Sequence, residues 1–279
     1  MGPKTILVCL TTQEHAATLM KVAVPLARRS GAHLVGLHTL ERLEVYPGIA
    51  VHVPDSAVAA FIASQKARAD AIEAVFRAHV DAEDFVGEFR VVQAESSTAS
   101  ERMVESARAA DLVIMAHEDR SVDRFDQRRA QADVIRQSGR PVIVVPLDYD
   151  GPPVGHKVLL GWSETREAAR AAHDMLAMLA PGADIVVLRV KDLARSEMED
   201  SDMLDVTTAL ARHGHKVELR HLNQAGQAIA DVLVDCAFEI GADLVVTGAF
   251  GHSTAYDFVV GATSTSLLRN AKLPLLLSK

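Results

Sequence analysis

The sequence of 279 residues is poor in aromatic side chains, which make up only 4% of it, although hydrophobic residues make up 49%. A core with so few rings has to be built from valine, isoleucine, leucine and alanine. Such a core is the usual filling of a parallel sheet that is buried between helices. The composition therefore favours an α/β fold.

Cysteine is also scarce in this chain. Cys9 and Cys236 are the only two cysteines, and each lies in an apolar segment of a different half of the chain. A disulfide between them would require two separate cores to meet, so we expect two buried, free thiols.

The chain has neither an excess of positive charge nor a long apolar run. Its formal charge at pH 7 is -8 and its pI is about 5.8, whereas nucleic acids and anionic membranes are bound through clustered Lys and Arg. No uncharged apolar stretch approaches the length of a membrane span, and the first residues contain no apolar signal core. We therefore expect a cytoplasmic protein without nucleic-acid or membrane partners.

Common catalytic motifs are missing as well. The sequence has no G-x4-G-K-[ST], no G-x-G-x-x-G and no G-x-S-x-G. His213, His215 and His221 lie close together in the sequence, but without the spacing and the neighbouring carboxylate or thiolate that are typical of a metal site. A binding protein is favoured over an enzyme, and no catalytic or metal-ligating residue is predicted.

The chain does contain an internal repeat. The segment TILVCLTTQEHAA from Thr5 matches KVLLGWSETREAA from Lys157, and ARAADLVIM from Ala107 matches EIGADLVVT from Glu239. Between the copies lies the sequence GPP at 151–153, where paired prolines stop both a helix and a central strand. The repeat predicts two domains, residues 1–148 and 154–279.

Short apolar runs alternate with amphipathic helical segments in each copy. Strands are predicted at 4–10, 32–38, 85–92, 111–115 and 141–145, and again at 157–162, 184–190, 216–221, 243–247 and 274–277; helices are predicted at 15–29, from 55 onward, and at 99–109, 132–137, 164–178, 198–211 and 227–240. Right-handed crossovers then give each copy a doubly wound, five-stranded parallel sheet. We interpret the charged runs 123–129 and 197–205 as solvated surface.

A loop punctuated by glycines follows the fourth strand of the second copy. Gly248, Gly251 and Gly261 form the pattern G-x2-G-x9-G, and Thr263 or Ser264 opens a helix. Glycine lets backbone N–H groups approach phosphates and permits a positive φ, and a helix N-terminus adds further donors. The loop also lies at the sheet edge where such folds bind ligands. The residues alone leave a second interpretation open, in which these are turn glycines and Ser264 is an ordinary N-cap.

The first copy has none of these glycines. Ala116 and Asp119 stand where the second copy has Gly248 and Gly251, and Arg128 stands for the third glycine. Side chains there would block the approach of the backbone, and Asp119 would repel phosphate. We therefore expect the first copy to be a degenerate domain that holds no nucleotide.

These segments resemble the universal stress protein family in its tandem two-domain form. The most specific parts are GAFGHS and VVGATSTSLLR between residues 248 and 269, ADLVVTG before them, and KVLLGWSETREAARAA from Lys157. The resemblance implies a fold like the adenine-nucleotide alpha-hydrolases, a role in the stress response, and ATP, with or without Mg²⁺, bound by the second domain. The candidate cofactor-binding residues are Gly161, Trp162, Ser163, Val190, Gly248, Gly251, His252, Gly261, Ala262, Thr263 and Ser264.

The resemblance assigns these candidates to different parts of the ligand. The glycines correspond to the phosphate loop, Thr263 and Ser264 lie near phosphates and ribose, and Val190 lies beside adenine. For Trp162, at the end of the first strand beside the base, packing in the core remains open. For His252, contact with phosphate and capping of the turn both remain open.

Two positions depart from the family pattern. Ser163 stands where family binders usually carry Asp or Asn, and Ala262 follows the third glycine where Ser, Thr or Gly is usual. Serine still forms neutral hydrogen bonds and Ala262 still offers its N–H, so we expect weaker rather than abolished binding.

The resemblance also concerns partners. The fifth strands, 141–145 and 274–277, are expected to pair the two copies with each other, and a homodimer of the whole chain remains open. Two other functions also remain open: a nucleotide-free dimerisation or interaction scaffold of the stress response, and a slow nucleotide hydrolase.

Overall fold

The computed structural model describes residues 2–41, 53–93, 98–119, 125–191, 201–251 and 262–279. Its first half contains β1 (Thr5–Cys9), α1 (Gln13–Ser30), β2 (His33–Leu40), α3 (Asp55–Val80), β3 (Gly87–Gln93), α4 (Ala99–Ala107), β4 (Leu112–Ala116), α5 (Phe125–Gln137) and β5 (Val142–Val145). Its second half contains β6 (Lys157–Gly161), α6 (Arg166–Met175), β7 (Asp184–Lys191), α7 (Ser201–Arg212), β8 (Lys216–Asn223), α8 (Ile229–Ile240), β9 (Leu244–Gly248), α9 (Ala262–Asn270) and β10 (Leu275–Ser278). The predicted α/β alternation is confirmed in both halves.

The strands of both halves form one ten-stranded sheet in the order β3-β2-β1-β4-β5-β10-β9-β6-β7-β8. Neighbouring strands are parallel within each half, but β10 runs antiparallel to β5, with Leu276 opposite Ile143. The two five-stranded sheets predicted from the sequence are thus continuous across this seam. The strand order reverses between β1 and β4 and again between β6 and β9, and ligands of open α/β sheets bind at the carboxyl ends of such strands.

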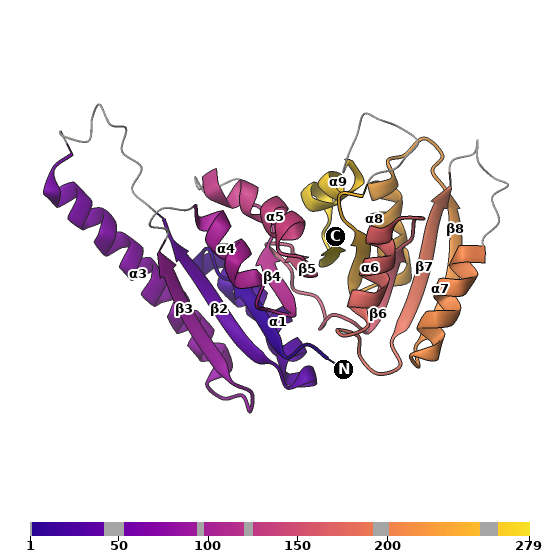
Figure 1. Cartoon of the computed structure of the whole chain (residues 1–279), viewed down its shortest axis with the longest axis horizontal. Coiled ribbons are helices and arrows are strands. Elements are labelled where there is room, and N and C mark those ends of the chain that lie inside the picture. Colours follow the sequence, from indigo (N-terminus) through magenta and orange to yellow (C-terminus); the bar gives the residue numbers. More distant parts are fainter. Residues whose placement is uncertain (1, 42–52, 94–97, 120–124, 192–200, 252–261) are drawn as a thin grey trace.

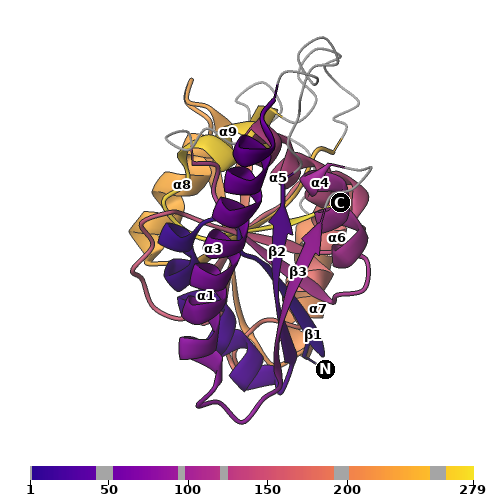
Figure 2. The ribbon, with the colours of Figure 1, turned by 90° about the vertical axis from the view of Figure 1, so that its left-hand side faces the viewer.

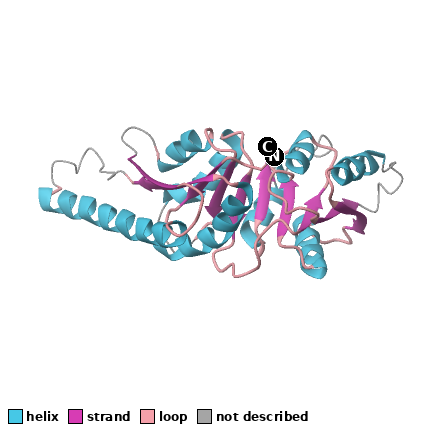
Figure 3. Cartoon of the chain, turned by 90° about the horizontal axis from the view of Figure 1, so that it is seen from below, coloured by secondary structure: helices cyan, strands magenta, loops and turns pink. Residues whose placement is uncertain are grey.

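Helices cover both faces of the sheet (Figure 3). Buried side chains of α1, α3, α6 and α7, among them Met20, Phe76, Met175 and Met203, belong to one apolar cluster, and those of α4, α5, α8 and α9 belong to the other. Each cluster contains residues of both halves, so the core does not stop at the junction between them. Figure 2 shows α3 lying along α1, with its N-terminal part extending past the ends of the neighbouring strands.

One helix in each half, α1 and α8, ends at a left-handed glycine. Gly31 after α1 and Gly241 after α8 both adopt left-handed conformations, with φ of 60° and 66°, and donate their N–H to Ala27 and Ala237. A residue without Cβ takes this conformation at little steric cost.

The structure corrects one expectation about a charged run. Helix α5 begins at Phe125, earlier than the predicted start at 132, whereas α7, at Ser201–Arg212, confirms the helix predicted at 198–211. Burial of Ala130 and Val134, four residues apart, supplies the packing that stabilises α5 where a charged sequence gives little apolar periodicity. Residues 123 and 124 lie outside the described ranges.

Two expectations from composition bear on the fold. Cys9 and Cys236 are buried, free thiols, as predicted. Among the helices in the described ranges, none combines the length and the apolar character needed to cross a membrane.

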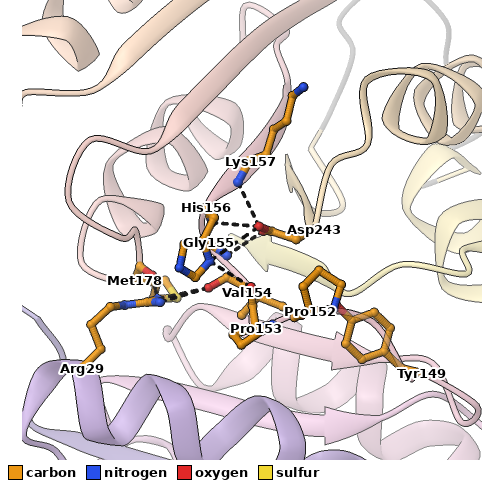
Figure 4. A network of polar contacts seen from close by, with 10 residues as sticks. All are labelled: Arg29, Tyr149, Pro152, Pro153, Val154, Gly155, His156, Lys157, Met178 and Asp243. Carbon is orange, nitrogen blue, oxygen red and sulfur yellow. Dashed lines mark hydrogen bonds and ion pairs between the residues drawn. The ribbon is translucent and has the colours of Figure 1, made fainter.

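The segment between the halves is held by a buried carboxylate, Asp243, at the start of β9 (Figure 4). Asp243 is only 5% exposed and accepts hydrogen bonds from the N–H groups of Gly155, His156 and Lys157 at 2.6, 2.9 and 2.9 Å. Asp111 is its counterpart in the first half, but it is exposed and accepts from only Lys4 and Thr5, at 2.8 and 3.0 Å. The duplicated aspartate therefore has a stronger anchoring role in the second half.

Arg29 of α1 fastens the same segment to the first half (Figure 4). Its half-buried guanidinium donates to the carbonyl oxygen of Val154, at 3.2 Å, and to that of Met178, which follows α6. One side chain of the first half thus bridges the connecting segment and the body of the second half.

Candidate functional site

The candidate site lies at the carboxyl ends of β6 and β9, where the strand order of the second half reverses. Gly161 at the end of β6 is paired with Thr247, next to the end of β9 at Gly248. The N–H of Trp162 donates to Leu188 at 2.8 Å, as Leu10 donates to Leu37 in the first half. The structure therefore brings the predicted residues of both strand ends to one edge.

Gly248 and Gly251 are glycines because the first turn of α6 lies against them. A Cβ on Gly248 would stand 2.6 Å from the backbone of Glu167 and Ala168, and one on Gly251 would stand 3.0 Å from Oε2 of Glu167. Neither glycine has a positive φ. The expected role of these two glycines in permitting a left-handed turn is therefore wrong. Close approach of the α6 backbone explains Gly248, and the carboxylate of Glu167 lies against Gly251.

In the described part of this loop, up to Gly251, the left-handed residue is Phe250, which has a φ of 51°. Its ring is buried, with 4% of the residue exposed, and its N–H donates to Oγ of Ser264 at 3.1 Å. The N–H of Ala249 donates to Ser278 of β10 at 2.8 Å. Because both of these amides are used within the protein, any backbone amide that this loop offers to a ligand comes from Gly251 or later.

The helix that closes the loop, α9, begins at Ala262. Ser264 in its first turn is only 4% exposed and its oxygen fixes the position of Phe250, while Thr263 is partly buried. The hydroxyl of Ser264 thus has a structural partner whether or not a ligand is bound. His252 and Gly261, which the sequence also singled out, lie outside the described residues.

The end of β6 carries a polar group of its own. Exposed Ser163 shares a hydrogen bond with Thr165 at 3.2 Å, and Thr165 accepts from Ala168 as the N-cap of α6. Ser163 therefore lies at the expected edge, but its hydroxyl takes part in the helix cap.

Trp162 joins a cluster of charged residues that the sequence did not single out. Its indole Nε1 donates to Oδ2 of Asp202 at 2.7 Å, and the same carboxylate is paired with Arg189, which also contacts Glu164 at 3.2 Å. Trp162 packs against one core cluster and Val190 against the other. Asp202 belongs to the acidic run that we interpreted as solvated surface; a carboxylate at the start of a helix beside a β-strand end is the signal that could have identified it.

Glu167 is the second residue that sequence reasoning missed. Its side chain is 5% exposed, beside Gly251, and accepts a hydrogen bond from Arg166 at 2.8 Å. Burial raises the pKa of the Glu167 carboxyl, but hydrogen bonds from Arg166 and from its own backbone, with the charges of Arg166 and Lys279, bring the pKa below its ordinary value. An ionised carboxylate therefore lies beside the glycine loop at neutral pH.

In the first half, side chains fill the equivalent corner, by which we mean the space between the start of the half's first helix and the end of its fourth strand, here α1 and β4. His15 occupies the repeat position of Glu167, and Asp119 that of Gly251. Nε2 of His15 and Oδ2 of Asp119 lie 2.8 Å apart, with both side chains about 15% exposed. The pair takes the place that Glu167 and Gly251 have in the second half.

A small hollow remains beside this pair. It has a volume of about 20 Å³ and is lined by residues at the ends of β1 and β4 and on α5, namely Cys9, Thr11, Met115, Ala116, His117, Glu118, Ala130 and Gln131. Nε2 of Gln131 donates to the carbonyl oxygen of Ala116 at 2.5 Å and so covers the end of β4. A hollow of this volume accommodates about one water molecule and is far too small for a nucleotide.

The described residues contain no group of three or more His, Cys, Asp or Glu side chains arranged to hold a metal ion. His213 and His215, the pair noted in the sequence, flank the turn after α7, and burial together with the charge of His213 lowers the pKa of His215.

Comparison with known families decides the affiliation of the chain. The model of the universal stress protein family matches twice, at residues 2–146 and 155–279. The chain belongs to the universal stress protein family. The two matches also show its tandem form, in which each half is one copy of the family's domain.

Solved universal stress proteins share this fold. One from Archaeoglobus fulgidus DSM 4304 is 15% identical, with a TM-score of 0.69 over 98% of this chain and 96% of its own. One from Pseudomonas aeruginosa UCBPP-PA14 is 15% identical, with a TM-score of 0.58 over 99% of this chain and 93% of its own. Identities this low show the fold alone.

Two further comparisons concern a solved complex with cAMP and the curated proteins. A universal stress protein solved in complex with cAMP is 19% identical and matches 44% of this chain and 97% of its own, with a TM-score of 0.34. Among curated proteins, none matches the chain by sequence at a significant level.

Proposed function

We propose that the second half of this universal stress protein binds an adenine nucleotide, ATP foremost, and that the first half is a nucleotide-free structural partner. The observation that carries the proposal is the difference between the two corners. Gly251 puts no side chain at its position in the loop after β9. At the equivalent position of the first half, the side chain of Asp119 is paired with His15. Backbone amides approach an anion only where no side chain intervenes.

The charges around the loop favour a nucleotide that brings Mg²⁺ with it. Glu167 lies beside Gly251 as an ionised carboxylate and would repel a bare triphosphate. A Mg²⁺ ion carried by the phosphates reduces that repulsion, since a bound cation is often the largest local charge in a phosphate site. Binding should therefore weaken when EDTA replaces Mg²⁺.

The decisive experiment is titration of the full chain with ATP by calorimetry, with ADP, AMP, cAMP and GTP as comparison ligands. Trp162 is the only tryptophan and contacts Asp202 at the same sheet edge, so its fluorescence gives a second readout. We expect one ATP per chain. Two ATP per chain would contradict the asymmetry between the halves.

Variants at equivalent positions supply the control. Gly251→Asp places a carboxylate in the loop beside Glu167 and should abolish binding, whereas Asp119→Gly, at the matching position of the first half, should leave it unchanged. Equal binding by wild type and Gly251→Asp, or no binding by wild type, would defeat the proposal. The second outcome would favour the nucleotide-free interaction scaffold.

The proposal includes a role in the cytoplasmic stress response, which family membership and the acidic composition support. A homodimer of the whole chain is tested by light scattering with and without ATP. Hydrolysis is tested by Mg²⁺-dependent phosphate release, which Gly251→Asp should abolish if the bound nucleotide is the substrate.

A further inference from the structure

The glycine loop of the second half is in contact with a residue of the first half. The guanidinium carbon of Arg136, in the last turn of α5, lies 4.0 Å from the centroid of the Phe250 ring. A cation over an aromatic face at this distance is attracted by the electron density of the ring. The contact joins the two halves at the point where the loop turns.

Phe250 has the unusual backbone conformation at the start of the loop, just before Gly251. A positive φ is uncommon for a residue with a bulky side chain and persists only when its surroundings hold it. Its N–H donates to Ser264, its ring is buried in one of the two apolar clusters, and the guanidinium of Arg136 lies over the ring. The hydrogen bond belongs to the second half, whereas the cation–π contact is supplied across the seam.

We propose that Arg136 is a positioning residue that, through the ring of Phe250, holds the turn from which Gly251 presents its amide to the nucleotide. This inference rests on the proposed function, because its consequence is measured as nucleotide affinity. Through Arg136, the first half would then influence the nucleotide site of the second half without contacting the ligand.

The repeat provides a matched control for this proposal. Arg269 of α9 corresponds to Arg136, since each lies six residues before the strand that follows, β10 or β5. The first-half counterpart of Phe250 is Glu118, so the equivalent pair has no aromatic ring. Arg136→Gln and Arg269→Gln remove the same charge from equivalent helices.

The test compares ATP affinity in these two variants of the full chain. Arg136→Gln should raise the Kd about three-fold, a fold-change expected for loss of one exposed cation–π contact, and Arg136→Lys should restore most of it. Arg269→Gln should leave the Kd unchanged. Equal effects of the two Gln variants would reduce the role of Arg136 to a contribution to net charge and would overturn the proposal.

A second variant separates positioning from direct contact with phosphate. Phe250→Leu keeps an apolar side chain but removes the ring, so Arg136→Gln should have no further effect on Kd in that background. If the effect persists there, Arg136 acts on the ligand itself and the positioning role is wrong.

Hydrogen exchange of the Phe250 amide keeps this inference testable apart from nucleotide binding. The amide donates to Ser264, and its protection should fall in Arg136→Gln but not in Arg269→Gln. Unchanged protection in both variants would overturn the inference even if ATP binds. Failure of ATP to bind, with protection altered as expected, would instead reject the proposed function and leave the coupling of the halves intact.

Discussion

The same corner of the sheet occurs once in each half of this chain, with different side chains at equivalent positions. In the first half, His15 and Asp119 lie 2.8 Å apart and fill the space between the first helix and the end of the fourth strand. In the second half, Glu167 stands at the position of His15, and Gly251 leaves the other position without a side chain. The duplicated backbone therefore keeps its topology while the side chains at these two positions differ in size and charge.

The largest expected effect comes from rebuilding the first corner in the second half. Glu167→His combined with Gly251→Asp should recreate the ion pair and weaken ATP binding by at least about 100-fold, because a carboxylate then faces the phosphates. The Tm should stay within about 3 °C of wild type, since the new pair replaces an interaction of similar size. Calorimetry and a thermal melt measure the two quantities.

The single variant is the control for this exchange. Gly251→Asp alone puts two carboxylates side by side, so it should melt at a lower temperature than the double variant. If the double variant still binds ATP as wild type does, the comparison of the corners has no bearing on function.

The next largest effect concerns the duplicated aspartates at the starts of β4 and β9. Asp243→Ala leaves three N–H groups, that of buried Gly155 among them, without their acceptor and should cost about 3 kcal/mol of unfolding free energy. Asp111→Ala removes an exposed acceptor of two N–H groups and should cost about 1 kcal/mol. Urea denaturation of both variants checks this, and equal costs would contradict the stronger anchoring assigned to Asp243.

The next prediction tests whether removing the His15–Asp119 pair is enough to create a nucleotide site in the first half. His15→Glu with Asp119→Gly should not add a second ATP, because Gln131 still covers the end of β4 and the hollow beside it holds about 20 Å³. Calorimetric stoichiometry should stay at one ATP per chain. A stoichiometry of two would show that the side-chain pair alone closes the first half.

The smallest expected effect concerns the two thiols. Burial raises the pKa of Cys9 to about 12 and also raises that of Cys236, and only the thiolate is a nucleophile. Iodoacetamide at pH 8 should therefore label neither cysteine in the native chain and both after unfolding, as measured by mass spectrometry. Labelling of native Cys9 would indicate that the first corner is more open than the structure shows.

Much of the fold was predictable because the strands are continuous apolar runs and the helices are periodic. The repeat at Thr5 and Lys157 fixed the equivalence of the halves, and paired prolines marked the connection. The start of α5 was not predictable, since a charged run in that segment gives little apolar periodicity and its helix depends on packing of Ala130 and Val134.

The site was predictable in outline but not in its chemistry. Glycine spacing identified the loop, yet Glu167 beside Gly251 and Arg136 over the ring of Phe250 are far from the loop in the sequence and meet it only in the fold. A positive φ at Phe250 also follows from tertiary contacts rather than from local preference. Sequence patterns find positions with a local conformational demand, and they miss partners that come from another element.

The antiparallel pairing of β5 with β10 has a consequence for how the two copies were able to diverge. Separated from its neighbour, either half would present an unpaired, largely apolar edge strand of four residues, a template for aggregation. Because the two copies are covalently connected, each is present at a high effective concentration near the other, and each edge strand stays covered. Separate subunits reach such a concentration only when the protein is abundant. Either copy can therefore change at its sheet edge, provided that it keeps the strand that covers the other copy.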